Sequence, residues 1–160
     1  MVTRLHTREA SGLRLDRELR FWHDGERVEH AGISKAFLRG VTLSDDGRPM
    51  LRIGADWCFI AVDEAAFGVD SIAFKDGEPW LTLSDGAVEL LDAESLRLGQ
   101  DGEFLALVKG GRALARFSRQ AQVDLGLHLE ADSDGFTLAL PSRTVVLRGL
   151  GGSLKGAPPT

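Results

Sequence analysis

Four basic residues lie within eleven positions in the last third of the chain: Lys109, Arg112, Arg116 and Arg119. Arginine side chains bind carboxylate or phosphate groups through paired hydrogen bonds. If residues 112–117 form a strand, Arg112 and Arg116 share one of its faces. A helix beginning at Ser118 would add backbone N–H groups that attract anions. This pattern predicts a site for a small anionic ligand or a protein partner, with Arg116 and Arg119 as its charged residues.

The same charges have a simpler interpretation. Charged residues protect exposed sheet edges, and they also form ion pairs with acidic neighbours. The chain has a net charge of −5, and residues 41–100 alone carry −8. Ion pairs with this acidic middle segment are therefore the alternative to an anion site. The chain has no strongly basic face of the kind that binds nucleic acid, so nucleic acid is not expected as a partner.

The three tryptophans, Trp22, Trp57 and Trp80, all fall in predicted strands, and the chain has no tyrosine. Packing in a core or between sub-domains is the expected role of such residues, and each indole N–H then needs a hydrogen-bond partner. In the ligand hypothesis, Trp22 and Trp57 supply apolar walls beside the two arginines.

Metal ligands and nucleophiles are not indicated. The histidines share no spacing typical of a metal site, and Cys58 has no thiol partner. Cys58 lies in the apolar run 57–62, which favours a small buried hydrophobe over a nucleophile. We therefore expect no metal and no cofactor, and we assign no catalytic residue. A hydrolase or transferase remains the alternative, because separated groups such as Asp56, His23 and His30 could meet in one pocket.

The bulk properties indicate a globular chain. It has 160 residues, 43% of them hydrophobic, which is enough for a core without disulfide or metal support. One cysteine allows no internal disulfide, which favours a reducing cytoplasm. Residues 1–10 lack the apolar stretch of a secretory signal, and the run 57–62 is too short to span a membrane.

The elements that must position these residues are mostly short strands. Hairpin turns are predicted at Asp24-Gly25, Asp76-Gly77 and Asp85-Gly86. Apolar residues at helical spacing predict a short helix over residues 33–39, with Gly40 just beyond its end. The remaining strands are expected at residues 50–53, 57–62, 69–74, 79–84, 87–91, 104–108, 112–117, 136–140 and 144–147.

A pattern of hairpin, helix and hairpin occurs twice, once over residues 19–62 and once over residues 104–147. Residues 118–129 fit a strand period and a helix period, and the repeat favours a helix over 118–125. We therefore predict an α+β fold, mainly β, with two β-rich sub-domains of related topology. Their expected bounds are 12–66 and 67–150, and residues 151–160 have the composition of a flexible tail.

Several segments resemble an uncharacterised bacterial family, a domain of unknown function. They are Phe21–Gly25 with Val28–His30, then Asp46-Gly47, then Trp57–Phe67, then Leu114–Arg119. Ala66 stands where that family usually has proline, and Phe59 stands where it often has arginine. The resemblance implies a duplicated core, a C-terminal half like a pleckstrin-homology barrel, and a role in ligand-dependent signalling through the sub-domain interface.

Together these observations predict a cytoplasmic, non-enzymatic ligand-binding or interaction module. Its site is expected at the interface between the two halves, with Arg116, Arg119, Trp22 and Trp57 as the candidate ligand-binding residues. A third interpretation is a structural subunit that pairs with itself through an exposed strand edge.

Overall fold

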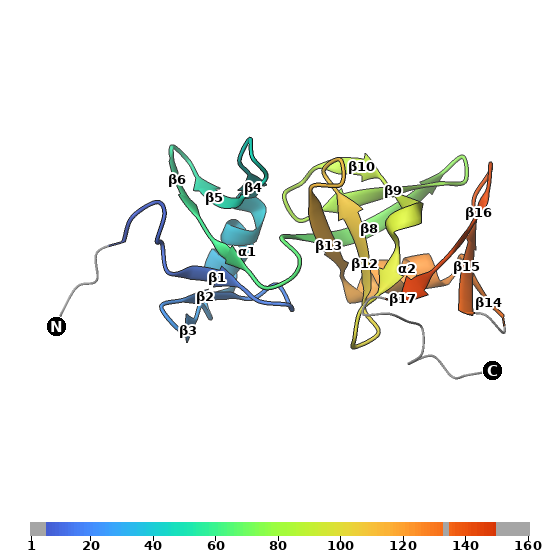
Figure 1. Ribbon diagram of the computed structural model, residues 1–160, viewed down its shortest axis with the longest axis horizontal. Coiled ribbons are helices and arrows are strands. Elements are labelled where there is room, and N and C mark those ends of the chain that lie inside the picture. Colours follow the sequence, from blue (N-terminus) through green and yellow to red (C-terminus); the bar gives the residue numbers. More distant parts are fainter. Residues whose placement is uncertain (1–5, 133–134, 150–160) are drawn as a thin grey trace. The chain divides into compact units, whose positions relative to one another are not determined.

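The computed structural model describes residues 6–132 and 135–149, so the predicted flexible tail at 151–160 lies outside the described residues (Figure 1). Across the described residues the fold is of the α+β class and mainly β, as the sequence predicts. The chain divides into two compact units between Phe67 and Gly68. Each unit has buried apolar side chains of its own, among them Leu15 and Phe21 in the first and Leu81 and Leu105 in the second.

The N-terminal unit contains two small sheets and a helix among its described residues. One sheet has the strand order β3-β2-β1-β7, and the other has the order β4-β5-β6. The elements are β1 (Leu13–Leu15), β2 (Phe21–His23), β3 (Glu26–Arg27), α1 (Ala31–Gly40), β4 (Val41–Leu43), β5 (Pro49–Ile53), β6 (Asp56–Phe59) and β7 (Ala61–Val62).

The turn between β2 and β3 has the predicted conformation. Asp24 has a φ of 50° and Gly25 a φ of 84°, and a type I′ turn needs positive φ at both central positions. Trp22 lies opposite Arg27, and His23 lies opposite Glu26. The hairpin therefore places His23 and Asp24 together at its tip.

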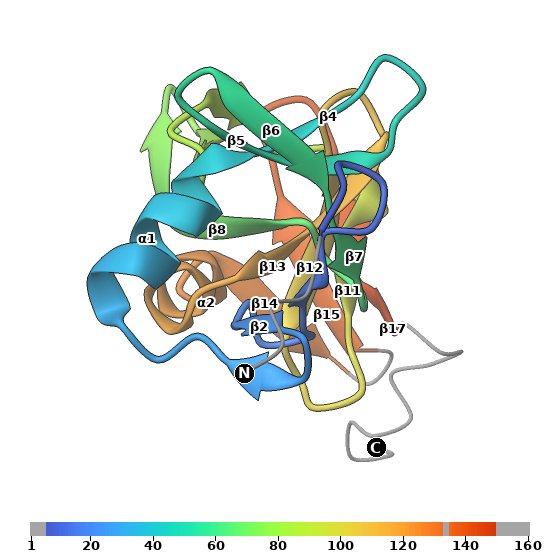
Figure 2. The ribbon, with the colours of Figure 1, turned by 90° about the vertical axis from the view of Figure 1, so that its left-hand side faces the viewer.

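Helix α1 begins two residues before the predicted start and includes Gly40. The ring of His30 accepts a hydrogen bond from the N–H of Ile33 at 3.2 Å and caps the helix. Gly40 is the last helical residue. A Cβ there would lie well under 3.0 Å from the carbonyl oxygen of Arg52 in β5, so a glycine allows the helix and strand to approach. Figure 2 shows β5 and β6 above α1.

The apolar run 57–62, predicted as one buried strand, forms two strands in different sheets. β6 pairs with β5, whereas β7 pairs in parallel with β1. Ile60 lies between them and is buried, but Trp57, Cys58 and Phe59 are only half-buried. The prediction of one continuous buried strand was wrong, because the chain crosses from one sheet to the other at Ile60.

The C-terminal unit contains a seven-stranded sheet and a three-stranded sheet among its described residues. Their strand orders are β10-β9-β8-β13-β12-β11-β17 and β14-β15-β16. The elements are β8 (Phe67–Lys75), β9 (Glu78–Leu83), β10 (Val88–Leu90), the 3₁₀ turn η1 (Ala93–Ser95), β11 (Arg97–Leu98), β12 (Phe104–Val108), β13 (Ala113–Phe117), α2 (Arg119–Gly126), β14 (Leu129–Asp132), β15 (Gly135–Ala139), β16 (Thr144–Val146) and β17 (Arg148–Gly149).

Helix α2 confirms the choice of helix over strand for residues 118–125. The hydroxyl of Ser118 accepts a hydrogen bond from the N–H of Ala121 at 3.1 Å, which is an N-cap interaction. Ala121 and Leu125 are fully buried one helical turn apart. No helix in residues 6–132 and 135–149 is long and apolar enough to cross a membrane.

Candidate functional site

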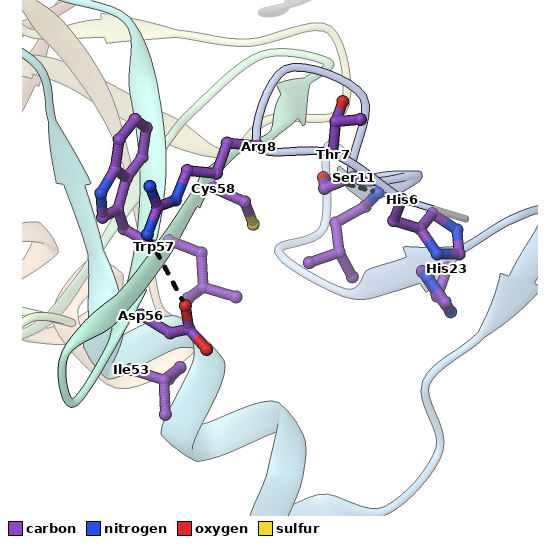
Figure 3. A pocket seen from close by; sticks show the side chains of 11 residues that line it. His6, Thr7, Arg8, Ser11, His23, Ile53, Asp56, Trp57 and Cys58 are labelled. Carbon is purple, nitrogen blue, oxygen red and sulfur yellow. Dashed lines mark hydrogen bonds and ion pairs between the residues drawn. The ribbon is translucent and has the colours of Figure 1, made fainter. Parts of the chain in front are cut away.

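A pocket of about 360 Å³ lies in the N-terminal unit (Figure 3). It is formed by the segment before β1, the tip of the β2–β3 hairpin, and strands β5 and β6. Its lining residues are His6, Thr7, Arg8, Ser11, Leu13, His23, Leu51, Ile53, Asp56, Trp57 and Cys58. The pocket thus combines apolar side chains with guanidinium, imidazole, carboxylate and hydroxyl groups.

Hydrogen bonds fix the segment before β1 against β6. The carbonyl of Arg8 accepts a hydrogen bond from the N–H of Phe59 at 2.8 Å. The hydroxyl of Ser11 donates to the carbonyl of Phe59 at 2.7 Å and accepts from the N–H of Leu13 at 3.1 Å. These bonds hold Arg8 and its neighbours at the pocket, although the segment has no regular secondary structure.

A salt bridge also holds the same segment. Arg48 donates to both carboxylate oxygens of Glu9, at 2.9 and 3.0 Å. The hydrogen bond from Arg48 lowers the pKa of Glu9 below its ordinary value, and the carboxylate raises the pKa of Arg48. The guanidinium of Arg48 also lies over the ring of Phe59, 3.5 Å from its centroid.

One side of the pocket carries an arginine stacked on a tryptophan. The guanidinium carbon of Arg8 lies 4.6 Å from the ring centroid of Trp57, within the range of a cation–π contact. Arg8 is 3.9 Å from Asp56, and the side chains are 58% and 93% exposed. An exposed ion pair of this length contributes little, so Arg8 can exchange Asp56 for another anion.

The facing side of the pocket carries two histidines, His6 and His23 (Figure 3), and both lie close to the carboxylate of Asp24. His6 Nε2 is 2.8 Å from Asp24 Oδ2, and His23 Nε2 is 3.7 Å from the same oxygen. The two imidazole rings lie 4.8 Å apart between centroids. The sequence gives no hint of this cluster, because His6 and Asp24 are 18 residues apart and meet only when β1 pairs with β2.

Trp22 lines a second pocket of the same unit, of about 430 Å³, which shares Ser11 and Leu13 with the first. Its indole N–H donates to Asp16 Oδ2 at 2.9 Å. The predicted need for an indole partner is therefore confirmed for Trp22. The sequence interpretation missed Asp16, a residue buried in the loop between β1 and β2.

Asp16 is a hydrogen-bonding centre. Its Oδ1 accepts from the backbone N–H groups of Glu18 at 2.8 Å and Arg20 at 2.9 Å. Burial by itself would raise the pKa of Asp16, but the bonds from Trp22 and from the backbone outweigh it and hold this pKa below its ordinary value. Asp16 is therefore ionised when it positions Trp22.

The two predicted arginines belong to the C-terminal unit, whereas Trp22 and Trp57 belong to the N-terminal unit. Arg116 is half-buried and donates to Glu103 Oε2 at 3.3 Å, and the Glu103 side chain is 4% exposed. Arg119 is exposed at the first residue of α2. Neither arginine lines the two pockets described above, so the site predicted from these four residues together stays a prediction.

Lys109, another basic residue of that cluster, makes contacts of the kind that the simpler interpretation predicts. Lys109 Nζ lies 2.6 Å from Asp85, and the backbone N–H of Lys109 donates to Glu89 at 3.1 Å. Both acidic residues come from the acidic middle segment of the sequence. Ion pairing of Lys109 with that segment is thus what the alternative predicted.

The structure places the three residues of the enzymatic alternative as follows, and that alternative stays a prediction. His23 and Asp56 line one pocket, but His23 contacts His6 and Asp24 while Asp56 lies near Arg8. His30 caps α1. Cys58 is half-exposed and lines the pocket, so the prediction that it is buried was wrong.

Comparisons with known proteins identify the fold. The structure is similar to that of a DUF1285 family protein from Silicibacter pomeroyi DSS-3, with a TM-score of 0.60 and 17% identity, over 91% of this chain and 81% of that one. It is also similar to a DUF1285 family protein from Shewanella baltica OS155, with a TM-score of 0.50 and 13% identity, over 73% of this chain and 91% of that one. No protein-family model and no curated protein matches the sequence.

These neighbours confirm the predicted likeness to an uncharacterised family at the level of the fold. At such identities they carry no activity or ligand over to this chain. The duplicated core, the pleckstrin-homology-like half and the signalling role stay predictions.

Proposed function

We propose that this protein is a non-enzymatic binding module for a small ligand that combines an acidic group with a flat apolar group. The proposed site is the pocket lined by Arg8, Trp57 and His23. The observation that carries the proposal is the loosely paired guanidinium of Arg8 over Trp57 inside that pocket.

The flat apolar group of the proposed ligand is inferred from the side chains of the pocket wall. Trp57 is half-buried, and its ring meets Phe59 edge-to-face at 5.5 Å, which fixes its orientation. Leu13, Leu51 and Ile53 add apolar surface to the same pocket. A flat ring that packs against the part of Trp57 left exposed beside Arg8 would remove apolar area from water, at about 25 cal/mol for each Å².

The acidic group of the proposed ligand is inferred from the position of Arg8 in the pocket. Its distant partner Asp56 is almost fully exposed, so an incoming carboxylate or phosphate meets little competition. A ligand anion in a partly desolvated pocket can accept two parallel hydrogen bonds from a guanidinium. The backbone of Arg8 is already fixed by its bond to Phe59, which lowers the entropy that binding must cost.

The hydroxyl of Ser11 supports binding over catalysis. It donates to one backbone group and accepts from another, so neither role leaves it ready to act as a nucleophile. A nucleophile needs a base within hydrogen-bond reach, and the pocket offers Ser11 a backbone carbonyl in that place.

A thermal-shift screen against aromatic carboxylates, nucleotides and small phosphorylated metabolites tests the proposal, because a ligand that binds only the folded state raises the unfolding midpoint. Hits would then be titrated by calorimetry.

We expect Arg8→Ala to weaken binding about 10- to 100-fold, as loss of a charge-assisted hydrogen bond does. Trp57→Ala should weaken it about tenfold. The matched controls are Arg39→Ala, an exposed arginine of α1, and Trp80→Phe of β9, and both should leave the affinity unchanged.

Two results would contradict the proposal. One is a screen in which no compound of this class raises the midpoint. The other is a hit whose affinity Arg8→Ala and Trp57→Ala leave intact, since the ligand would then bind elsewhere.

A further inference from the structure

We infer that His6, His23 and Asp24 form a binding site for one divalent transition-metal ion, with zinc as the best match. The nearest ligand atom of each of these three residues lies within 4.8 Å of the others. His6 and His23 also line the pocket of the proposed ligand site. The metal inference does not depend on that ligand, because it can be tested with the metal alone.

The spacing of the three atoms suits a single ion. Zinc lies about 2.1 Å from imidazole nitrogen and carboxylate oxygen, so two ligands of a tetrahedral ion are roughly 3.4 Å apart. The Nε2 atoms of His6 and His23 are 2.8 and 3.7 Å from Asp24 Oδ2, which brackets that value. Small side-chain rotations would bring the three atoms around one ion.

The ligand types select the class of metal. Two imidazole nitrogens and one carboxylate oxygen favour zinc, nickel, cobalt or copper over magnesium and calcium, which prefer oxygen ligands alone. Three protein ligands also leave a coordination position for water or for another ligand atom. His6 and His23 both line the pocket, so that position would be reached from it.

The backbone around Asp24 holds its carboxylate in place. Gly12 has a φ of 77°, and a Cβ at Gly12 would lie well under 3.0 Å from Asp24 Oδ1. The carbonyl of Gly12 also accepts a hydrogen bond from the N–H of Asp24 at 2.9 Å. The glycine thus lets the carboxylate lie against the start of β1, where it meets His6.

The side chains are partly shielded from solvent. Those of His6 and Asp24 are 28% and 24% exposed, and that of His23 is 45% exposed. Partial burial reduces the competition of bulk water for the ion, while the exposed remainder leaves an entry path. An ion at this position would link the segment before β1 to the tip of the β2–β3 hairpin.

The test is a titration of the metal-stripped chain of 160 residues with Zn²⁺ and Co²⁺ by calorimetry and by visible absorption. We expect one ion for each chain and a rise in the unfolding midpoint that a chelator reverses. Mg²⁺ and Ca²⁺ should give no such rise. Co²⁺ should show the visible bands of nitrogen and oxygen coordination without an intense near-ultraviolet thiolate band.

Single variants identify the ligands. His6→Ala, His23→Ala and Asp24→Asn should each weaken Zn²⁺ binding about tenfold or more, because each removes a ligand. Asparagine tolerates the positive φ of Asp24, so the third variant keeps the turn. His128→Ala is the matched control, since His128 lies in the C-terminal unit, and it should bind Zn²⁺ as the parent does.

The inference is overturned if the chain binds no Zn²⁺ or Co²⁺, or if the three variants bind as tightly as the parent. It is also overturned if His128→Ala weakens binding as much as they do, which would indicate scattered surface histidines. A thiolate band that disappears in Cys58→Ser would replace this ligand set by one that includes the cysteine.

Discussion

Asp16 shows how much one buried side chain can organise. Its carboxylate joins the loop between β1 and β2 to the indole of Trp22, and Leu19 in that loop has a φ of 63°. A non-glycine residue with positive φ is costly and needs support from its surroundings. The hydrogen bonds of Asp16 to Glu18 and Arg20 supply that support on both sides of Leu19.

Asp16→Asn should lower the free energy of unfolding at neutral pH by about 1–3 kcal/mol, because it replaces a buried charged acceptor with a neutral amide that has only one acceptor oxygen. Urea denaturation followed by circular dichroism measures this change. Asp45→Asn, which changes an exposed aspartate outside the regular strands, is the control and should stay within about 0.5 kcal/mol of the parent. Equal losses in both variants would show that the bonds of Asp16 contribute little.

The same residue predicts a pH dependence. The pKa of Asp16 in the folded state lies below its ordinary value of 3.8. The ionised carboxylate therefore contributes stability above that ordinary value, and this contribution is lost as the pH falls through the lowered pKa of the folded state. The stability difference between the parent and Asp16→Asn should hold from neutral pH down to the ordinary carboxyl pKa and shrink below it. A difference that does not change with pH would contradict the assignment.

At the scale of elements, the close packing of α1 on β5 depends on the lack of a side chain at Gly40. A Cβ at Gly40 would lie well under 3.0 Å from a backbone oxygen of β5, and backbone atoms cannot rotate away as side chains do. Gly126, the last residue of α2, is a useful contrast, because nothing lies within 4 Å of a Cβ built there.

Gly40→Ala should therefore destabilise the protein by about 1–3 kcal/mol through overpacking. Gly126→Ala should instead stabilise it by up to about 1 kcal/mol, since alanine has the higher helix propensity. Both are glycine-to-alanine changes at the last residue of a helix. Thermal or urea unfolding of the two variants therefore distinguishes the effect of steric overlap with β5 from the effect of helix propensity. If both variants move in the same direction, the packing of α1 on β5 is looser than described.

The turns were predictable from sequence because their chemistry is local. Asp24-Gly25 and Asp76-Gly77 both have positive φ at their two central residues, as the dipeptides indicate. The helix predicted after Ser118, where periodicity alone was ambiguous, is confirmed by α2, whereas the repeat that favoured it stays a prediction. The crossing at Ile60 was not predictable, because Trp57–Val62 reads as one apolar run and only its partners β5 and β1 divide it.

The candidate site was harder to predict for a related reason. Trp57 could be selected by its type, but Arg8 lies in a charged segment with no periodicity. The meeting of His6 with Asp24 depends on the β1–β2 register and on the φ of Gly12. Arg116 was singled out as a ligand residue, yet its contact with buried Glu103 exists only in the folded unit. Spacing along a sequence carries no information about such distant contacts.

At the scale of the whole molecule, the chain has a core on either side of Phe67, and we propose that the predicted sub-domains 12–66 and 67–150 unfold as separate units. Leu15 and Leu105 are both fully buried, one in each core. Truncating a buried leucine to alanine costs about 2–5 kcal/mol. Leu15→Ala should therefore lower hydrogen-exchange protection in the strands of the N-terminal unit, and Leu105→Ala in those of the C-terminal unit, because local opening follows the stability of each cooperative unit. Exchange measured by mass spectrometry on the intact chain compares the two variants directly, and each serves as the other's control. Equal loss of protection across the chain in both variants would mean that the protein unfolds as one unit. The proposed boundary would then not separate two cooperative units.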